Sequence, residues 1–385
     1  MKKKSLFSYL ELSKKNLIHN VKQLKDIAKK GVKVVSVIKA NAYGHGQNEV
    51  AKILEPFTDY FGINSIAELE ILRKVSRKKT FVLGYIAEND LEKAIKLKCV
   101  LSVFSMDHFK KINKTVKKFK KIQEINIPVD AYLGREGFLE DELPELFKEI
   151  KKSKYIKLIG IYAHFANIED TNNFTHAEKQ IKKYNEAIEL AEKFGFKNLD
   201  THISATSGLL VYETCLPVGM EEKGVNNIIR LGIGIYGLWP SEHIQYEYKN
   251  KLELKPVLSW KTKVAQVKIL PAGNTIGYGL TYKTKKKTKI AVIPQGYADG
   301  LDRGLSNKGA VLIKGTRCKI LGRVAMNMFV VDVSHLSDVK AEDEVVLIGK
   351  QKGEQITTEE IAENIGTINY EIVARLSSLL PRIII

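Results

Sequence analysis

The stretch VKVVSVIKANAYGHG, Val32–Gly46, gives the strongest indication of the fold. Its first half is a run of apolar, mostly β-branched residues, which is typical of a strand buried on both faces. That strand is expected to end at Lys39, where the chain enters a loop of small and polar residues. Strands buried on both faces occur in parallel sheets that helices cover, so this stretch favours an α/β fold.

Short apolar runs of this kind recur before Pro240 and alternate with helical or polar stretches. Such alternation predicts parallel strands joined by crossover helices, and eight of them close a barrel. The sequence therefore predicts an N-terminal (β/α)8 barrel over residues 11–240. The expected strands are Val32–Lys39, Tyr60–Ile66, Thr80–Ile86, Val100–Phe104, Ile125–Ala131, Ile156–Phe165, Leu199–Thr206 and Ile228–Gly237. The expected helices are Ser13–Lys30, Ile66–Val75, Asp107–Phe119, Leu139–Lys151 and Phe174–Phe194.

The pattern changes after Pro240. Ser241–Lys255 is polar and is interpreted as a linker. The runs that follow are strand-like and separated by Gly, Pro and Lys turns, which predicts a mainly β domain over residues 241–385. Its expected strands are Leu258–Leu270, Lys289–Ile293, Ala310–Ile313, Met328–Val333 and Glu344–Ile348, and its expected helices are Thr357–Asn364 and Asn369–Leu380.

A length of 385 residues suits two domains, and a net charge of +18 raises the question of nucleic-acid binding. Only nine of the 62 basic residues are arginine, however, and the lysines are spread over expected helix faces. They do not form one stripe with aromatic residues, as a nucleic-acid interface would require. Runs such as Lys117–Lys121 and Lys283–Lys289 are interpreted as solvated faces and loop tips, so no nucleic-acid partner is expected.

Cysteine usage and the N-terminus bear on the compartment. Cys99, Cys215 and Cys318 are odd in number and lack metal-ligand or CxxC spacing, so we expect a reducing compartment and no metal. Lys2–Lys4 begins the chain, but Glu11 interrupts the next apolar stretch too early for a signal peptide. No apolar run reaches the roughly 18 residues of a membrane span. A cytoplasmic protein without a membrane partner is expected.

Lys39 is the first candidate for chemistry. Burial at the end of a strand disfavours the charged ammonium, so the pKa of this lysine should fall and more of it should be free amine. A neutral amine attacks aldehydes, as Schiff-base lysines do. The following loop offers the Tyr43 phenol and small residues that let the backbone approach an anion such as a phosphate. The alternative is a lysine at a strand end that extends to solvent.

The string VIKANAYGHG resembles the pyridoxal-phosphate lysine motif of the alanine racemases. The resemblance implies that Lys39 is the cofactor lysine and Tyr43 a phosphate ligand. It covers both halves of the chain and implies the same architecture, a barrel followed by a β domain. In that family a short N-terminal segment joins the second domain, which is the expected place of residues 1–10.

Further candidates lie where the barrel strands are expected to stop, which is where such barrels have their active sites. Arg135, in VDAYLGREGF, matches the family arginine that binds the substrate carboxylate, although it could instead be a surface arginine that pairs with Glu136. His164, in GIYAHFA, matches a histidine that lies against the cofactor ring. Arg230, in RLGIGIYG, matches the arginine that bonds the pyridine nitrogen. The remaining phosphate-binding positions match Thr206, Gly232, Ile233 and Tyr370.

Tyr278, in TIGYGLTY, matches the family's catalytic tyrosine, although a tyrosine between glycines could also be a simple turn residue. Racemisation removes a proton from one face of the α-carbon and returns one to the other, so Lys39 and Tyr278 are the expected pair of bases. The resemblance implies that this tyrosine enters the site of a second subunit, hence a homodimer with shared active sites. It also implies that Met326, in GRVAMNM, lies near the substrate.

Three positions depart from the family pattern. Pro128 stands where many members have a lysine that becomes carbamylated beside the carboxylate-binding arginine, so Arg135 must be oriented in another way. Ala205 replaces an asparagine, and Asn327 replaces an aspartate. These changes do not alter the predicted fold or the predicted cofactor. They put strict preference for alanine as substrate in question.

The predicted protein is an isomerase, a pyridoxal-phosphate-dependent alanine racemase that supplies D-alanine for cell-wall precursors. A broad-specificity, serine or lysine racemase on the same scaffold is an alternative. A decarboxylase of the same fold type is disfavoured, because its glycine-rich phosphate pattern and its cysteine–aspartate pair are missing. A non-enzymatic cofactor carrier would resemble a lone barrel, so the residues after Pro240 argue against it.

Overall fold

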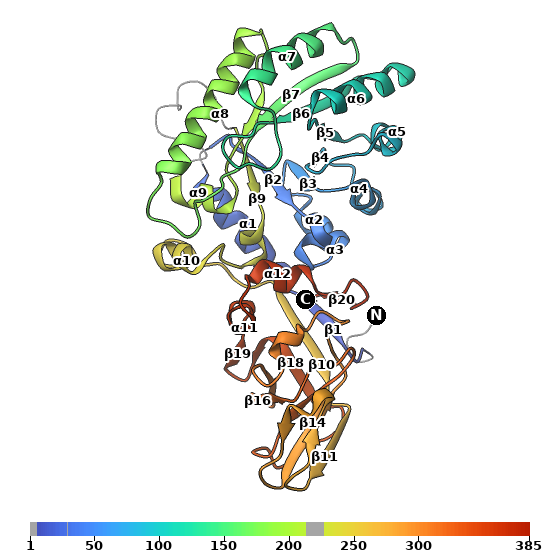
Figure 1. Ribbon diagram of the computed structural model, residues 1–385, viewed down its shortest axis with the longest axis vertical. Coiled ribbons are helices and arrows are strands. Elements are labelled where there is room, and N and C mark those ends of the chain that lie inside the picture. Colours follow the sequence, from blue (N-terminus) through green and yellow to red (C-terminus); the bar gives the residue numbers. More distant parts are fainter. Residues whose placement is uncertain (1–5, 29, 213–226) are drawn as a thin grey trace. The chain divides into compact units, whose positions relative to one another are not determined.

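The computed structural model describes residues 6–28, 30–212 and 227–385, so Cys215 lies outside the described residues. The chain divides into two compact units (Figure 1). The barrel unit consists of Leu17–Ala40 and Val50–Lys255. The β unit consists of residues 6–16, Asn41–Glu49 and Pro256–Ile385. Residues 241–255, expected to open the second domain, therefore cluster with the barrel unit.

The barrel unit is built on eight parallel strands in the order β8-β7-β6-β5-β4-β3-β2-β9. Between β8 and β9, Arg230 N donates a hydrogen bond to Ser204 O at 3.1 Å, so the sheet is a nearly closed barrel. The predicted barrel is thus confirmed. The strands are β2 (Lys33–Val37), β3 (Tyr60–Ile63), β4 (Thr80–Val82), β5 (Val100–Ser102), β6 (Gln123–Pro128), β7 (Ile156–Tyr162), β8 (Asp200–His202) and β9 (Ile228–Leu231).

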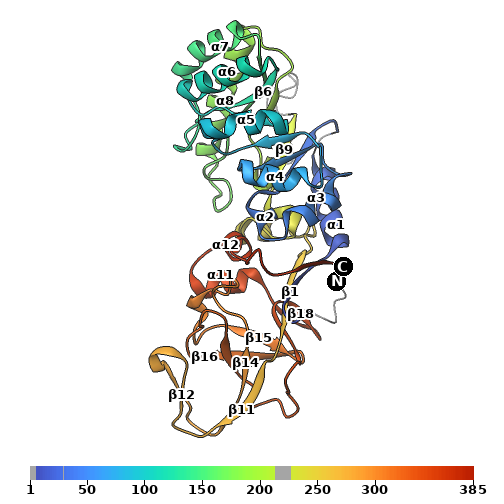
Figure 2. The ribbon, with the colours of Figure 1, turned by 90° about the vertical axis from the view of Figure 1, so that its right-hand side faces the viewer.

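Helices connect these strands and cover the outside of the barrel (Figures 1 and 2). In α6 the buried residues Phe109, Ile112 and Val116 recur every three or four positions and so lie on one helix face. Ser105 Oγ caps this helix by accepting a hydrogen bond from His108 N at 3.1 Å. The helices are α1 (Lys14–Ile27), α3 (Gln47–Leu54), α4 (Ile66–Arg73), α5 (Glu88–Leu97), α6 (Met106–Phe119), α7 (Leu143–Lys152), α8 (Thr175–Lys193), α9 (Thr206–Tyr212) and α10 (Glu242–Tyr248).

Three expectations for these residues need correction. The expected strand Leu199–Thr206 is shorter, because β8 ends at His202. The expected strand Ile228–Gly237 ends at Leu231 and continues as the 3-10 helix η3 (Ile233–Tyr236). The expected linker contains α10, whose N-cap Ser241 Oγ accepts a hydrogen bond from Ile244 N at 3.1 Å. A helix that exposes most of its residues shows little apolar periodicity, so its composition resembles that of a linker.

The β unit contains a sheet in the order β11-β14-β17-β16-β15-β18-β10-β1-β20, with β19 paired to β18. β1 (Tyr9–Leu12) pairs antiparallel with β10 and parallel with β20. Figure 2 shows β12 at the margin of this unit. The remaining elements are β10 (Leu258–Lys263), β11 (Gln266–Leu270), β12 (Thr275–Ile276), β13 (Tyr282–Lys283), β14 (Thr288–Ile293), β15 (Ala310–Ile313), β16 (Thr316–Leu321), β17 (Phe329–Asp332), β18 (Glu344–Gln351), β19 (Glu354–Ile356), α11 (Thr358–Ile365), α12 (Asn369–Ala374) and β20 (Arg382–Ile384).

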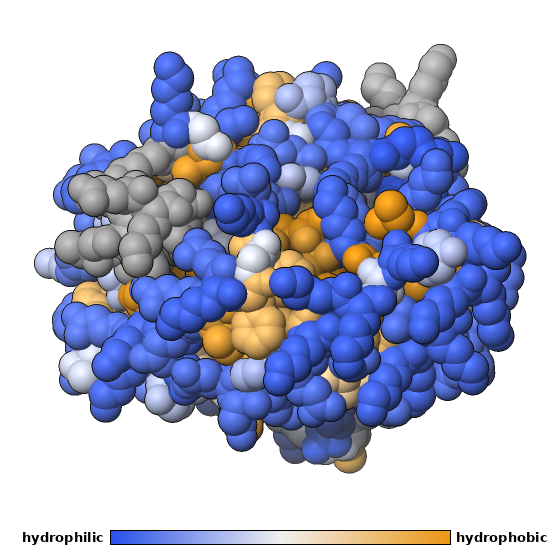
Figure 3. Space-filling model, turned by 90° about the horizontal axis from the view of Figure 1, so that it is seen from above, coloured by the Kyte–Doolittle hydropathy of each residue, from blue (hydrophilic) through white to orange (hydrophobic). Residues whose placement is uncertain are grey.

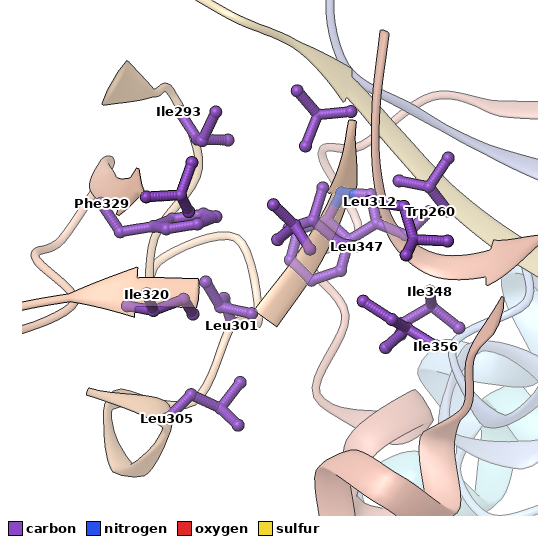
Figure 4. Packing of buried hydrophobic residues seen from close by; sticks show 14 of the residues in the cluster. Trp260, Ile293, Leu301, Leu305, Leu312, Ile320, Phe329, Leu347, Ile348 and Ile356 are labelled. Carbon is purple, nitrogen blue, oxygen red and sulfur yellow. The ribbon is translucent and has the colours of Figure 1, made fainter. Parts of the chain in front are cut away.

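Trp260 anchors the core of the β unit. It is 1% exposed and packs with Leu312 and Leu347, which come from two other strands of the sheet (Figure 4). Its indole Nε1 donates a hydrogen bond to Gln295 Oε1 at 3.1 Å. Burial therefore leaves no polar ring atom unpaired, and the full apolar area of the indole stabilises the fold.

The surface in Figure 3 consists mostly of hydrophilic residues, with apolar residues gathered near the middle of the view. Lys117 and Lys118 are exposed in the last turn of α6, and Lys285–Lys287 is exposed between β13 and β14. These lysine runs are the solvated face and loop tip that the sequence predicts. Within residues 6–28, 30–212 and 227–385, no helix has the length and apolar character needed to cross a membrane.

Candidate active site

The barrel places a group of predicted site residues at the carboxyl ends of its strands, which meet at one face of the fold. These residues lie near the carboxyl ends of five strands or in the segments that follow them, so positions far apart in the sequence share this face. Lys39 follows β2, Arg135 follows β6, His164 follows β7, Thr206 follows β8, Arg230 lies in β9, and Gly232 and Ile233 follow β9.

Lys39 has the environment that the sequence predicts. Burial lowers the pKa of its ammonium, and the positive charges of Arg135 and Arg230 lower it further. Both effects disfavour the charged form, so a larger fraction of Lys39 is free amine than for a solvated lysine. The alternative, a strand-end lysine that extends freely to solvent, does not fit this burial.

The residues after Lys39 form a left-handed turn, α2 (Lys39–Tyr43). Four consecutive non-glycine residues have φ between +51° and +54°, namely Ala40, Asn41, Ala42 and Tyr43. The left-handed conformation costs an L-residue roughly 1–2 kcal/mol, so surrounding contacts must stabilise this segment. The sequence predicts a plain loop at these residues, and nothing in it indicates the left-handed conformation.

Glu68 in α4 fixes the start of the turn. Its Oε1 accepts a hydrogen bond from Ala40 N at 2.7 Å, and its Oε2 accepts one from Asn64 N at 2.6 Å. The carboxylate thus joins the residue after Lys39 to the end of β3. Sequence reasoning missed Glu68, because a glutamate near the start of a helix is ordinary and nothing in the sequence relates it to Lys39.

Arg230 is buried and is held by backbone carbonyls. Its guanidinium donates to Ala163 O at 2.7 Å, to His202 O at 2.9 Å and to Ile203 O at 3.1 Å. It also contacts two imidazoles, through Nδ1 of His164 at 3.3 Å and through Nδ1 of His202. An unpaired buried charge is expensive, and these acceptors offset that cost without a carboxylate.

The two imidazoles beside Arg230 are neutral. Burial lowers the pKa of His164 to about 3, and Arg230, Arg135 and Lys39 contribute in the same direction. Burial and Arg230 also hold the pKa of His202 well below its ordinary value. Because a guanidinium only donates, each Nδ1 must accept and the ring proton must lie on Nε2. His202 was not predicted from the sequence. Its position offered a signal, because His202 ends β8 and the predicted His164 lies two residues after the end of β7.

Arg135 is paired with its neighbour in the sequence. Its Nη2 donates to Glu136 Oε1 at 2.8 Å and its Nε donates to Glu136 Oε2, so the contact is bidentate. The Arg135 side chain is 61% exposed, whereas that of Glu136 is 21% exposed. The pairing with Glu136, which the sequence analysis gives as the alternative, is present, yet Arg135 still lies close enough to Lys39 to lower its pKa.

Thr206 packs against η3 and carries a buried hydroxyl that could bind an anion. Thr206 is 2% exposed, and its Oγ1 has no hydrogen-bond partner among the described residues. A Cβ on Gly234 would lie 2.6 Å from Thr206 Cγ2, so only glycine lets η3 approach this closely. A buried hydroxyl without a partner is costly, and an oxyanion that accepted its hydrogen bond would remove that cost.

A cavity of about 290 Å³ adjoins this cluster within the barrel unit. Arg135, His164 and Ala205 lie on its wall together with Glu169 and Ser207. Ser207 Oγ donates to Glu169 Oε1 at 2.7 Å. A space of this size with a few convergent polar groups suits a small polar ligand such as an amino acid.

The other predicted residues belong to the β unit. The rings of Tyr43 and Tyr370 have centroids 6.2 Å apart. Arg382 Nη2 donates to Gly44 O at 2.8 Å and so supports the segment after Tyr43, a contact that sequence reasoning missed. Tyr278 opens the 3-10 turn η4 (Tyr278–Leu280) and is 73% exposed, and Met326 is 55% exposed.

Comparison with known proteins gives matches over nearly the whole chain. Residues 12–240 match the family model of the N-terminal domain of alanine racemase, and residues 257–384 match that of its C-terminal domain. The chain is 36% identical to the alanine racemase of Methanococcus maripaludis, covering 97% of this chain and 98% of that protein. It is 32% identical to that of Leptospira interrogans, covering 98% and 96%.

Solved structures of alanine racemases also match this chain over nearly its whole length. The alanine racemase of Clostridium difficile 630 superposes with a TM-score of 0.89 at 32% identity, over 99% of this chain and 96% of that chain.

Proposed function

The chain belongs to the alanine racemase family, and we propose that it interconverts L- and D-alanine with pyridoxal phosphate as cofactor. The observation that carries this proposal is the place of Lys39, whose pKa burial lowers, at the carboxyl end of a barrel strand in a chain that matches this family over both domains. We further propose that the protein acts in the cytoplasm and that its D-alanine serves cell-wall precursor synthesis.

The described residues fit the proposed cofactor. The unpartnered Thr206 hydroxyl lies beside η3, so Thr206 with Gly232 and Ile233 suits the phosphate, and the family resemblance adds Tyr43 and Tyr370. The Lys39 amine suits the aldehyde. Arg230 and His164 suit the ring. Bound pyridoxal phosphate would supply an electron sink that acidifies the α-hydrogen of an amino acid.

Arg230 limits the chemistry to simple proton return. Its guanidinium is permanently charged and does not give up a proton, so it can donate a hydrogen bond to a pyridine nitrogen but does not protonate it. Carbonyl oxygens and imidazole Nδ1 atoms already hold it in place. Racemisation needs the proton returned to the same carbon, which an arginine in this role favours.

Two bases are proposed, one for each face of the α-carbon. Lys39 Nζ takes or returns the proton on one face, and Tyr278 Oη does so on the other. Arg135 binds the substrate carboxylate through its guanidinium fork, and Met326 lies near the substrate. These roles follow the family motifs residue by residue.

A homodimer is proposed because the side chain of Tyr278, a proposed base, is mostly exposed in the single chain. It is 73% exposed, and Leu280, Met326 and Met328 of the same unit are 68%, 55% and 52% exposed. Several large exposed side chains in the unit that carries a proposed base favour a surface that a partner covers. A second copy of the chain, presenting its barrel site, is the proposed partner.

A first experiment tests the cofactor lysine. The purified protein should absorb visible light, borohydride should remove that absorbance, and peptide mapping should find the label on Lys39. Lys39→Ala should abolish the label and the activity, whereas Lys52→Ala, on an exposed position of α3, should leave both unchanged. A label on a different lysine would contradict the assignment.

A second experiment tests the reaction and its breadth. Incubation with single L-amino acids in D₂O, followed by chiral analysis, should give racemised, α-deuterated alanine. Serine is the second candidate substrate, because Ala205 lies on the wall of a cavity that also carries Ser207 and Glu169. Absence of turnover with every amino acid tested would reject the proposed function.

A further inference from the structure

Arg135 lies in a loop whose backbone is held in one arrangement. Asp130 Oδ1 accepts hydrogen bonds from Leu133 N and Gly134 N, both at 2.9 Å. Phe138 N donates to Pro128 O at 2.9 Å at the end of the loop. A Cβ at Gly137 would lie 2.4 Å from Asp130 N, so the loop closes onto itself where only glycine fits. The loop therefore fixes where residues 135 and 136 stand.

Glu136 occupies only one side of the Arg135 guanidinium. Its two carboxylate oxygens accept from Nε and Nη2, which form the side edge of the planar fork. Nη1 makes no hydrogen bond to any described residue. The end edge, formed by Nη1 and Nη2, is therefore open to a second carboxylate, and Arg135 lies on the wall of the 290 Å³ cavity.

Glu136 also lies within the field of the cationic cluster. Its carboxylate opposes the lowering of the Lys39 pKa, and it acts on His164 in the same sense. Burial raises the pKa of Glu136 itself, but the hydrogen bond from Arg135 brings that pKa below its ordinary value, so the group is ionised at neutral pH. An ionised carboxylate that is 21% exposed is a stable partner for a guanidinium.

We propose that Glu136 is the positioning residue of Arg135: it holds the guanidinium by the Nε edge and leaves the Nη1–Nη2 edge to bind the carboxylate of the substrate. This assignment rests on the proposed function. The opposite assignment is that Glu136 occupies the place of the substrate carboxylate and must leave when substrate binds. The two assignments predict changes of opposite sign when Glu136 is replaced.

Steady-state kinetics of Glu136→Gln and Glu136→Ala distinguish them. Gln keeps the shape but loses the charge and one acceptor, so KM for alanine should rise about tenfold with kcat within about twofold. Ala should raise KM further, and millimolar formate should lower the KM of the Ala variant towards that of Gln. Glu145→Gln, an exposed glutamate on α7, should change neither parameter.

Calorimetric titration of the holoenzyme with acetate gives a readout that does not require turnover. Acetate should bind more weakly to both Glu136 variants than to wild type. An unchanged or lower KM, or tighter acetate binding, overturns the inference and identifies Glu136 as a competitor for the site. If wild type racemises no amino acid, the proposed function fails, and the acetate titration still decides the role of Glu136.

Discussion

Lys39 and Tyr278, the two proposed bases, lie in opposite surroundings. Lys39 follows a buried strand, and burial with the charges of Arg135 and Arg230 lowers its pKa. Tyr278 is 73% exposed, and its neighbours Gly277 and Gly279 have φ of +73° and +71°. The charged groups that act on Lys39 belong to its own unit, whereas most of the Tyr278 side chain is not covered by any described residue.

The difference indicates how the proposed reaction depends on assembly. The environment of Lys39 is built by residues of the barrel unit, so its reactivity should be present in every folded chain. The environment of Tyr278 has to be supplied by whatever covers it. Proton transfer by Lys39 and proton transfer by Tyr278 should therefore respond differently to mutation, and the following predictions use that difference.

The largest effect is expected from Tyr278→Phe, which keeps the ring and removes the proton-bearing oxygen. Racemisation in both directions should fall by about 10² to 10⁴, roughly 3–5 kcal/mol of barrier, because each direction uses both bases. The family resemblance implies that Lys39 serves the D-enantiomer and Tyr278 the L-enantiomer. Exchange of the α-proton of D-alanine with D₂O should therefore survive better than exchange of L-alanine.

Tyr246→Phe is a matched control for that variant, because Tyr246 is 70% exposed on α10. It should leave both exchange rates unchanged. Equal loss of both exchanges in Tyr278→Phe, with the visible absorbance of the holoenzyme retained, would show that Tyr278 is not the second base.

A pH effect of about 2 kcal/mol is expected from His164. Its pKa of about 3 in the folded protein lies below the ordinary 6.5, so between these values the unfolded chain binds a proton that the folded chain refuses. Stability therefore rises with pH across this window and is lost as the pH falls below 6.5. From pH 7 to pH 5 that loss is about 2 kcal/mol for one histidine.

Urea denaturation at pH 7 and pH 5 measures this effect. His164→Asn should reduce the stability lost between the two pH values by about 2 kcal/mol relative to wild type. An identical pH dependence for His164→Asn and wild type would contradict the burial of a neutral imidazole beside Arg230.

A smaller effect, about tenfold in KM, is expected from Arg135→Lys. An ammonium cannot reproduce the bidentate fork, so substrate binding weakens while kcat changes little. Arg317→Lys is the matched control, because Arg317 also holds a glutamate, Glu360, through two hydrogen bonds. Added bicarbonate should affect neither variant, since Pro128 cannot be carbamylated. An unchanged KM in Arg135→Lys would remove Arg135 from the site.

The smallest effect is expected from replacing two exposed alanines by glycine, one in left-handed and one in right-handed backbone conformation. Ala40 has φ of +52° in the left-handed turn, whereas Ala67 lies in the right-handed helix α4. Ala67→Gly should lower the free energy of unfolding by about 0.5–1 kcal/mol. Ala40→Gly should leave that free energy unchanged or raise it by up to about 1 kcal/mol, because glycine relieves the strain. Equal losses in thermal denaturation would contradict the left-handed turn.

The strands of the barrel could be predicted from the sequence, because they follow from the periodicity of apolar residues. The run before Lys39 predicted a buried parallel strand, and the spacing of such runs predicted the barrel, because apolar alternation is a local signal. The same reasoning put Lys39 and His164 at strand ends, which the topology brings to one face, and it put Arg230 within a strand.

The missed features depend on contacts that no local pattern contains. Alanine favours the right-handed helix, so Ala40 and Ala42 do not indicate a left-handed turn. The carboxylate that holds the start of this turn comes from Glu68, which is distant in the sequence and lies in α4. The departure at Pro128 left the orientation of Arg135 open. The contact with Glu136 is between adjacent residues, yet only the folded loop reveals which edge of the guanidinium it uses.

The left-handed turn after Lys39 has a stereochemical consequence. Ala40 and Ala42 are L-residues with φ of +52° and +54°, a region that the mirror-image amino acid prefers by the same 1–2 kcal/mol that the L-form loses there. A chain assembled chemically with D-alanine at position 40 would adopt its left-handed φ without strain at that residue and keep the same hydrogen bond from its N–H to Glu68. Biosynthesis from L-amino acids alone therefore obliges the rest of the fold to supply, through tertiary contacts, the stabilisation that an inverted centre at each of the four residues would provide locally.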